Sequence, residues 1–325
     1  MIKFSVIVPT YNRAELLVQC LESLAKQRVS KKEYEVIVVD DGSSDETPAV
    51  VNAFRNRMQL RSVIHSRNRG VAAARNSGIR AARGRYIAFV ADDYEAPTTY
   101  AQTIVRMFSR HPTLSVIKFN LQTPRAPNHV QEALHAHWTY HIQAAYLTSL
   151  KQGELLRLKY SRVPFPKVRP FASTTLEVGV CAFRSGVFKR VGLFREDLTR
   201  GEDAEYAIRL AQQNIAAYFY PQIAIQRMYS KTLHAAFGNA YVSGRSQYKI
   251  KRHHPRYPLL VTNGIRKTFD RFANVIVVPL RMAARQASML RRIRYFCMML
   301  VIKLGGFLGE CEGLLRYIVL RMIRA

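Results

Sequence analysis

The chain has 325 residues, and 48% of them are hydrophobic, which excludes a mainly disordered protein and leaves room for one or two domains. Its 50 Lys and Arg against 22 Asp and Glu give a net charge of +28, which indicates a nucleic acid, an anionic membrane surface or an anionic substrate as partner. Four cysteines without zinc spacing predict reduced, mostly buried thiols in a cytosolic protein, and the start of the chain shows no export signal.

Strand-like and helix-like segments alternate through the first hundred residues. Short apolar runs predict strands at residues 4–8, 35–39, 61–65 and 85–90. Helical spacing of apolar residues predicts helices at residues 14–26, 45–57 and 70–82. Strands that alternate with helices indicate βαβ units, so we expect an α/β fold with a mostly parallel sheet.

The pattern changes along the rest of the chain. We expect helices at 100–110, 131–158 and 202–213, strands at 114–119, 178–183 and 217–225, and a proline-rich loop at 163–170. Beyond residue 226 only helices are predicted, at 233–252 and 266–304, with a break near Pro279. The sequence therefore predicts a catalytic domain over residues 1–225 and a basic helical region over 226–325.

Two acidic pairs stand at the ends of buried strands. Asp40 and Asp41 follow the run at 35–39, and Asp92 and Asp93 follow the run at 85–90. The carboxyl ends of parallel strands face the crevice in which α/β proteins bind ligands. Two acidic pairs at one crevice suit a hard metal cation and a polar, phosphorylated ligand. This pattern points to an enzyme that handles nucleotides.

Several motifs in a fixed order extend this interpretation. They lie at residues 6–13 (VIVPTYNR), 38–45 (VVDDGSSD), 68–78 (NRGVAAARNSG), 84–93 (GRYIAFVADD), 191–194 (VGLF) and 201–205 (GEDAE). Over about residues 1–215 the chain resembles the inverting family-2 glycosyltransferases, which have a GT-A fold, a Rossmann-like and mostly parallel sheet. The resemblance implies an enzyme that transfers a sugar from a nucleoside diphosphate to an acceptor hydroxyl.

The resemblance also assigns roles at the second acidic pair. It makes Asp93 the ligand of a divalent metal, Mn²⁺ or Mg²⁺, and places Asp92 on the ribose or in support of the metal. The family motif is often Asp-x-Asp, but Ala91 stands at the position of the first acid. The donor diphosphate would then supply most of the other metal ligands.

Further donor-binding residues follow from the same resemblance. Asp41 would accept from N3–H of uracil, which favours a UDP-sugar, although thymidine presents the same edge and a plain Asx turn explains the same residues. The other implied donor-binding residues are Pro9, Thr10, Tyr11, Asn68, Gly70 and Arg75. For Arg75 three alternatives are open: a phosphate partner, an ion pair with Asp41, or an ordinary surface arginine.

The acids at the start of the helix at 202–213 complete the implied site. Inversion needs a carboxylate base opposite the leaving group, and the resemblance assigns this role to Asp203, with Glu202 binding acceptor hydroxyls or orienting the loop. Acids at a helix start can also serve only the helix dipole. Many relatives carry a His near residue 227, where this chain has Arg227, a cation that could neutralise diphosphate.

The C-terminal region suggests where the enzyme works. Residues 226–325 hold 19 basic and 3 acidic residues, and arginines and a lysine interrupt each apolar stretch before it could span a membrane. Such helices suit an anionic membrane surface, or else a helical cap or an oligomer interface. We expect no nucleic acid partner, a glycan or lipid-linked acceptor, and a cytoplasmic protein bound peripherally to the inner face of the cell membrane. The alternative is a catalytically degenerate protein that only binds a nucleotide sugar.

Overall fold

The computed structural model describes residues 2–123, 126–135, 167–168, 176–228, 231–254, 275–277, 279–280, 283–284 and 288–322. Contacts within the chain divide it into two compact units. The first unit comprises Met1–Gln122 and Ala145–Met228, and the second comprises Thr123–Ala144 and Tyr229–Ala325.

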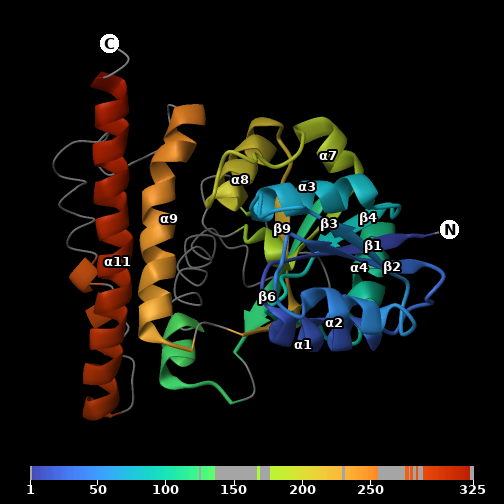
Figure 1. Cartoon of the computed structure of the whole chain (residues 1–325), viewed down its shortest axis with the longest axis horizontal. Coiled ribbons are helices and arrows are strands. Elements are labelled where there is room, and N and C mark those ends of the chain that lie inside the picture. The colour runs from blue at the N-terminus through green and yellow to red at the C-terminus, as the bar shows by residue number, and fades with distance from the viewer. Residues whose placement is uncertain are drawn as a thin grey trace. The chain divides into compact units, whose positions relative to one another are not determined.

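Four parallel strands form the first half of the sheet in the first unit (Figure 1). They are β1 (Phe4–Thr10), β2 (Tyr34–Asp40), β3 (Leu60–Ile64) and β4 (Tyr86–Phe89), joined by helices α1 (Ala14–Ala25), α2 (Thr47–Phe54) and α3 (Val71–Ala81). Their order in space is β3-β2-β1-β4, so the chain reverses direction across the sheet at β1. Ligands of α/β proteins bind at such a switch point, beyond the carboxyl ends of the strands.

The second half of the sheet is mixed. It comprises β5 (Tyr94–Glu95), β6 (Val116–Gln122), β7 (Lys167–Val168), β8 (Cys181–Arg184) and β9 (Ala217–Arg227), with α4 (Tyr100–Arg110), the 3₁₀ turn η2 (Val178–Val180), α7 (Gly186–Val191) and α8 (Glu202–Gln212). β8 runs antiparallel to both β4 and β6, and β6 runs parallel to β9. The short β5 pairs with the end of β9, which brings the segment after β4 against the last strand.

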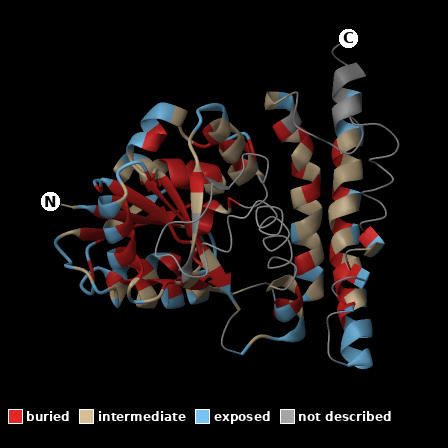
Figure 2. Cartoon of the chain, turned by 180° about the vertical axis from the view of Figure 1, so that it is seen from behind, coloured by how far each residue is buried: buried red, intermediate tan, exposed pale blue. Residues whose placement is uncertain are grey.

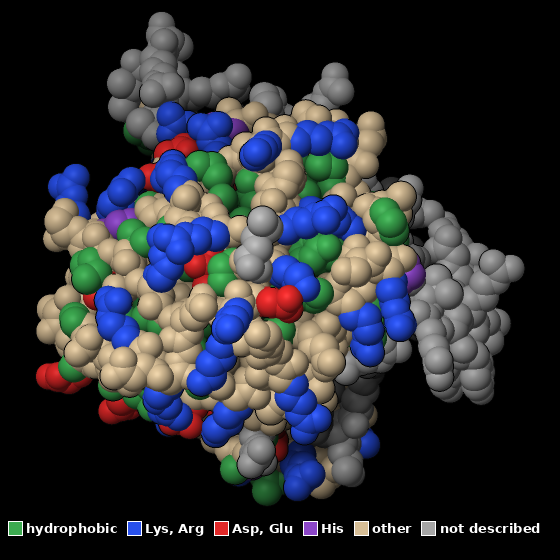
Figure 3. All heavy atoms as spheres, turned by 90° about the vertical axis from the view of Figure 1, so that its right-hand side faces the viewer, with side chains coloured by type: hydrophobic (Ala, Val, Ile, Leu, Met, Phe, Trp, Pro, Cys, Tyr) green, Lys and Arg blue, Asp and Glu red, His purple; other side chains and the backbone are tan. Residues whose placement is uncertain are grey.

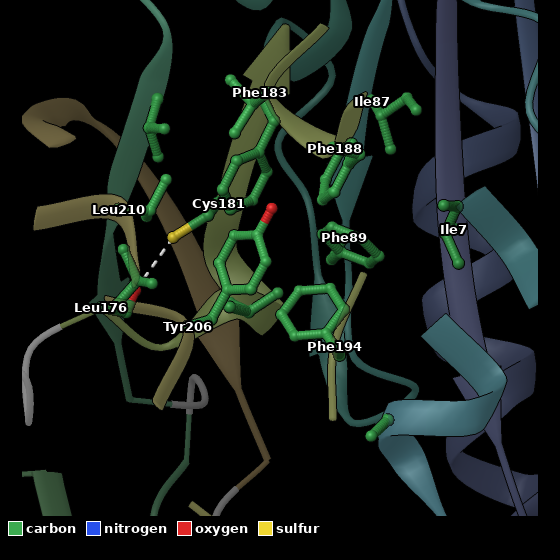
Figure 4. Packing of buried hydrophobic residues seen from close by; sticks show 14 of the residues in the cluster. Ile7, Ile87, Phe89, Leu176, Cys181, Phe183, Phe188, Phe194, Tyr206 and Leu210 are labelled. Carbon is green, nitrogen blue, oxygen red and sulfur yellow. Dashed lines mark hydrogen bonds between the residues drawn. The ribbon is translucent and has the colours of Figure 1, made fainter. Parts of the chain in front are cut away.

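An aromatic cluster fixes α7 and α8 against this sheet (Figure 4). Phe89 of β4 packs edge-on against Phe194, with ring centroids 5.7 Å apart, and Phe194 lies 4.4 Å from Tyr206 of α8. All three side chains are buried, as is the centre of the sheet (Figure 2). Because Tyr206 lies one turn beyond the start of α8, this packing holds the first turn of α8 close to the end of β4.

The expected α/β fold with a mostly parallel sheet is confirmed. The predicted strands and helices of the first hundred residues are all present, with ends that shift by up to three residues. Three expectations were wrong. Val178–Val180, predicted as the start of a strand at 178–183, form the 3₁₀ turn η2, and β8 begins at Cys181. Lys167 and Val168, predicted within a loop, form β7 and pair with β9. The helix predicted to end at residue 304 extends to Met322. Of the helix predicted at 131–158, residues 136–158 lie outside the described part.

Two helices that run in the same direction form most of the described second unit. α9 (Leu233–His253) is capped at its N-terminus by Thr232, whose hydroxyl accepts from the N–H of Ala235. α11 (Met289–Met322) packs along it, with Gly305 against Phe237 and Gly309 against Tyr241. These glycines, which usually weaken helices, allow the close approach of the two backbones, so the helix continues through them. In the described residues no helix is long and apolar enough to cross a membrane.

We predict that Gly309→Ala will destabilise the protein. A Cβ at Gly309 would overlap the carbonyl oxygen of Tyr241 and lie 3.0 Å from the backbone nitrogen of Arg245. Overpacking of this kind costs about 1–3 kcal/mol of unfolding free energy, measured by urea denaturation. The control is Gly238→Ala in α9, where a Cβ meets nothing within 4 Å. That change should stabilise the helix by up to about 1 kcal/mol, and equal effects of the two changes would contradict the packing.

Candidate active site

The carboxyl ends of β1 and β4 bring Thr10, Arg13 and the Asp92-Asp93 pair together. Thr10 Oγ1 donates to Asp92 Oδ2 at 2.9 Å, and an Arg13 terminal nitrogen lies 3.1 Å from Asp92 Oδ1 and 4.0 Å from Asp93 Oδ2. Burial raises the pKa of the Asp92 carboxyl to about 6; the Asp93 charge adds to this increase, and Arg13 opposes it. Both Asp92 oxygens have protein partners, whereas among the described residues the Asp93 carboxylate has Arg13 as an ion-pair partner at the longer distance of 4.0 Å and is partly exposed.

The first acidic pair organises the loop between β3 and α3. Asp41 Oδ1 accepts from His65 Nδ1 at 2.6 Å and from the N–H of Arg69 at 3.0 Å, and Oδ2 accepts from the N–H of Gly70 at 2.7 Å. His65 is buried, and its Nε2 lies 2.9 Å from Ser77 Oγ. A carboxylate has about four lone-pair sites, of which these bonds occupy three, and Asp41 itself is buried. Sequence reasoning missed His65, because one histidine after a short strand carries no pattern of its own.

The remaining predicted donor-binding residues lie around this loop and the end of β1. Tyr11 is 43% exposed, and Asn68 is also exposed. Gly70 has φ +91° and open space around its α-carbon, so its N–H can turn toward Asp41. Pro9 is the next-to-last residue of β1 and pairs with Val39 of β2. These residues lie near the carboxyl end of β1 and the loop after β3, and their contact with a donor stays a prediction.

Arg75 joins the acids of α8 instead of Asp41. One of its terminal nitrogens donates to Glu202 Oε1 at 2.8 Å and to Asp203 Oδ1 at 2.6 Å. The guanidinium is buried and stacks over Phe194, with 5.5 Å between Cζ and the ring centroid. Asp203 Oδ2 also accepts from the N–H of Val178 at 3.0 Å. Burial raises the pKa of Glu202 to about 7; the Asp203 charge adds to this increase, and Arg75 opposes it.

Glu177 connects the Asp92-Asp93 pair with the Glu202-Asp203 pair, which we call the two acid centres. Sequence reasoning missed Glu177 too. Its Oε1 accepts from Arg227 at 3.0 Å, its Oε2 lies 3.3 Å from the buried Lys118 Nζ, and the next residue, Val178, binds Asp203. Glu177 has φ +35°, an unfavourable backbone conformation for a residue with a side chain. No motif marks this position, since an isolated Glu gives no pattern.

Arg227 lies beside Asp93 because of strand pairing. It is the partner of Tyr94 between β9 and β5, and the N–H of Met228 donates to the carbonyl of Asp93 at 2.8 Å. Its guanidinium lies over the Tyr94 ring, 5.5 Å from the centroid, and is near enough to Arg13 for the two charges to interact. Arg13 and Arg227 thus place positive charge around the Asp92-Asp93 pair.

A metal at this site would depend on the ligand. In the described residues no group of three or more His, Cys, Asp or Glu side chains could hold a metal ion. Asp93 can offer one carboxylate, and Mg²⁺ is often held by one or two carboxylates together with substrate phosphates. The residues present therefore fit a metal that binds together with a phosphorylated donor, and do not form a complete metal site by themselves.

The fold and the two acid centres define a nucleotide-dependent α/β transferase class, and comparisons with known proteins give the family. The family model of glycosyl transferase family 2 matches residues 5–167. The chain therefore belongs to glycosyl transferase family 2, and its fold is GT-A.

Among curated proteins, the chain is similar to TarS, a poly(ribitol-phosphate) beta-N-acetylglucosaminyltransferase of Staphylococcus aureus. Identity is 39% over 120 residues, which cover 36% of this chain and 21% of TarS. It is also similar to validoxylamine A glucosyltransferase of Streptomyces hygroscopicus subsp. jinggangensis, at 31% identity over 224 residues, 65% of this chain and 52% of that protein. The chain thus matches between a fifth and about half of the length of these relatives.

Solved structures agree on the fold. TarS residues 1–349 in complex with UDP-GlcNAc superpose with a TM-score of 0.54 at 18% identity, covering 94% of this chain and 90% of that one. The mannosyltransferase PcManGT from Pyrobaculum calidifontis, in complex with GDP-Man and Mn²⁺, gives a TM-score of 0.62 at 17% identity, covering 96% and 87%.

Proposed function

We propose that the protein is an inverting glycosyltransferase that moves a single sugar from a nucleotide sugar to an acceptor hydroxyl. The observation that carries the proposal is the pair of acid centres at the carboxyl edge of the sheet. Asp93 lies at the end of β4, and Asp203 lies at the start of α8. The segment Glu177–Val178 bridges them, because Glu177 binds Arg227 beside Asp93 and Val178 binds Asp203.

Asp203 would act as the general base. It would take the proton of the acceptor hydroxyl while the hydroxyl oxygen attacks the anomeric carbon from the side opposite the diphosphate. The C–O bond to the diphosphate breaks as the new glycosidic bond forms, so the configuration inverts. Arg75 and the N–H of Val178 hold the carboxylate in one orientation, and Glu202 beside it would contact acceptor hydroxyls.

The leaving diphosphate needs positive charge. Mn²⁺ or Mg²⁺, when bound, would supply a Lewis acid there, and Asp93 is the residue that would hold it. PcManGT, which shares the fold, was solved with Mn²⁺, which supports a divalent metal without identifying its ligands. Thr10 and Arg13 keep Asp92 in place beside Asp93, where it could contact the ribose.

The base of the donor is proposed to be uracil. Asp41 would accept from N3–H of uracil at its remaining lone-pair site, and its other bonds fix the carboxylate by the N–H groups of Arg69 and Gly70. Cytosine lacks this donor, so a carboxylate discriminates against it. TarS was solved in complex with UDP-GlcNAc, which supports a UDP-sugar without identifying the sugar.

The acceptor is proposed to be a glycan or lipid-linked glycan at the inner face of the cell membrane, where the enzyme would bind peripherally from the cytoplasm. Relatives named for poly(ribitol-phosphate) support a polymer as the class of acceptor. Lys and Arg side chains outnumber Asp and Glu over the face shown in Figure 3. The excess of positive charge is therefore not confined to the basic helical region at 226–325. This charge favours an anionic surface.

The test is transfer or hydrolysis with a panel of nucleotide sugars in the presence of Mn²⁺. We expect activity with one UDP-sugar that is lost in Asp93→Ala. A chelator should abolish activity, and Mn²⁺ should restore it. An enzyme that binds no nucleotide sugar with or without metal would disprove the proposal.

We predict that Arg227→Ala will weaken binding of UDP but not of uridine. Arg227 lies beside Asp93, where the diphosphate would lie, and uridine lacks the charges that it would neutralise. A lost charge-assisted hydrogen bond costs about 1.5–3 kcal/mol, so the Kd of UDP, measured by calorimetry, should rise roughly ten- to a hundredfold. The control is Arg57→Ala, because Arg57 pairs with Glu22 on the surface.

Glu177→Gln provides the complementary result. This change removes the carboxylate that competes with the diphosphate of UDP for Arg227. UDP should therefore bind to Glu177→Gln as tightly as to the wild type, or more tightly. If Arg227→Ala weakened uridine and UDP equally, Arg227 would have only a structural role.

A further inference from the structure

α11 has a second apolar face that packs on nothing within the described residues. Its glycines pack on α9, as do Met299 and Ile302 with Ala236. Besides Met289 at its first position, the exposed apolar residues of α11 are Leu290, Ile293, Cys297, Leu304, Leu308, Leu315 and Val319, and these seven we call the outer stripe. At 100° per residue these positions fall within an arc of about 80°, turned roughly 120° from the glycines. One helix therefore carries two apolar faces, and α9 uses only one.

The charges of α11 show what kind of surface suits the outer stripe. Arg291, Arg292 and Arg294 are exposed in its first two turns, next to Leu290 and Ile293. The helix contains only two acids, both outside the arc of the stripe. Glu312 accepts from Tyr241 of α9 and from Arg316. At 100° per residue Arg294 lies about 20° outside the arc of the stripe, whereas Arg291 and Arg292 lie about 80° and 100° outside it, on the polar sides of the helix. An exposed apolar stripe on a helix whose polar sides carry arginines suits an anionic lipid surface.

The composition of α11 argues against a membrane span, and its charge argues against a second copy of the chain on the stripe. α11 does not qualify as a membrane span, so its apolar residues would enter a bilayer only from the side. A second copy on the stripe would bring its own excess of positive charge, since residues 226–325 hold 19 basic and 3 acidic residues. Anionic lipid supplies the opposite charge instead. A stripe from residue 290 to 319 would cover about 44 Å of such a surface.

We propose that α11 lies flat on an anionic membrane, with the outer stripe in the acyl boundary and Arg291, Arg292 and Arg294 on the headgroups. This deepens the membrane partner of the proposed function and rests on it. The helix would hold the enzyme at the surface where a lipid-linked acceptor is found. The glycines let α9 come close on one side, which leaves the stripe, roughly 120° away around α11, for lipid.

The experiment is flotation of the full chain with vesicles. Vesicles of phosphatidylcholine with about 30% phosphatidylglycerol should bind the protein at least about tenfold more tightly than phosphatidylcholine alone, and salt should weaken binding. Leu304→Asp with Leu308→Asp should abolish binding. Val18→Asp is the matched control, because Val18 is an exposed apolar residue of α1 in the first unit.

A second measurement does not depend on the stability of a variant. An environment-sensitive fluorophore on Cys297, with Cys311→Ser, should shift to the blue on phosphatidylglycerol vesicles, since Cys297 is exposed within the stripe. An unshifted fluorophore, or flotation unchanged by the two aspartates, would overturn the proposal. So would a dimer in light scattering that the two aspartates convert to a monomer without any binding to vesicles.

The same preparations separate this proposal from the proposed function. Protein that binds UDP but no vesicles refutes only the membrane face. Protein that binds vesicles but no nucleotide refutes only the transferase proposal.

Discussion

Asp203→Asn is expected to lower kcat by about 10²–10⁴-fold while leaving the Kd of UDP within about twofold, since general-base catalysis contributes a factor of that size. An amide cannot take the proton of the acceptor hydroxyl, and Asp203 contacts Arg75 and the N–H of Val178, not the donor-side residues Asp41 and Asp93. The measurement is steady-state transfer with the best donor of the panel, together with calorimetry of UDP binding.

Asp197→Asn serves as the matched control, because this exposed acid belongs to the loop just before α8 and pairs with Arg195. It should leave kcat unchanged. Unimpaired turnover in Asp203→Asn would remove Asp203 from the role of base. A wild type that binds UDP but transfers no sugar even with membrane extract would favour the degenerate binder instead.

Arg75→Met is expected to cost about 3–5 kcal/mol of unfolding free energy near pH 8, the cost of removing one partner from a buried ion pair. The change leaves Glu202 and Asp203 as neighbouring acids with no cation between them. Urea denaturation measures the loss. Arg75→Lys should recover part of it, because it restores the charge without both hydrogen bonds.

The unfolding free energy lost in Arg75→Met should become smaller as the pH falls. The folded pKa of Glu202 is already raised to about 7, mainly by burial, and without Arg75 it should rise further. For an acid whose folded pKa is raised, stability is greatest at low pH and falls as pH rises through the folded pKa. The difference between wild type and Arg75→Met should therefore shrink from pH 8 to pH 5.

A double variant tests the cause. In Arg75→Met with Glu202→Gln the remaining acid no longer has a charged neighbour, so much of the lost stability should return. A loss that stays constant with pH and is not reduced by Glu202→Gln would mean that Arg75 contributes packing on Phe194 and not charge compensation.

The buried strands could be predicted from the sequence, whereas the far end of α11 could not. β1, β2 and β4 were predicted because buried parallel strands are continuous apolar runs, as in the residues of β2 from Tyr34 to Asp40. The far end of α11 was not predicted, because glycines in sequence usually indicate a helix end. Only the approach of Phe237 and Tyr241 of α9 shows why Gly305 and Gly309 continue the helix.

By itself the sequence determined the alternation of strands and helices and placed the acids Asp41, Asp93 and Asp203, because local periodicity and short motifs carry both. Only the tertiary structure decided the partners of these acids. Arg75 reaches across 127 residues to Glu202, and Glu177 reaches Arg227 across 50. Such pairs depend on how strands far apart in the chain lie side by side, and no local pattern encodes that arrangement.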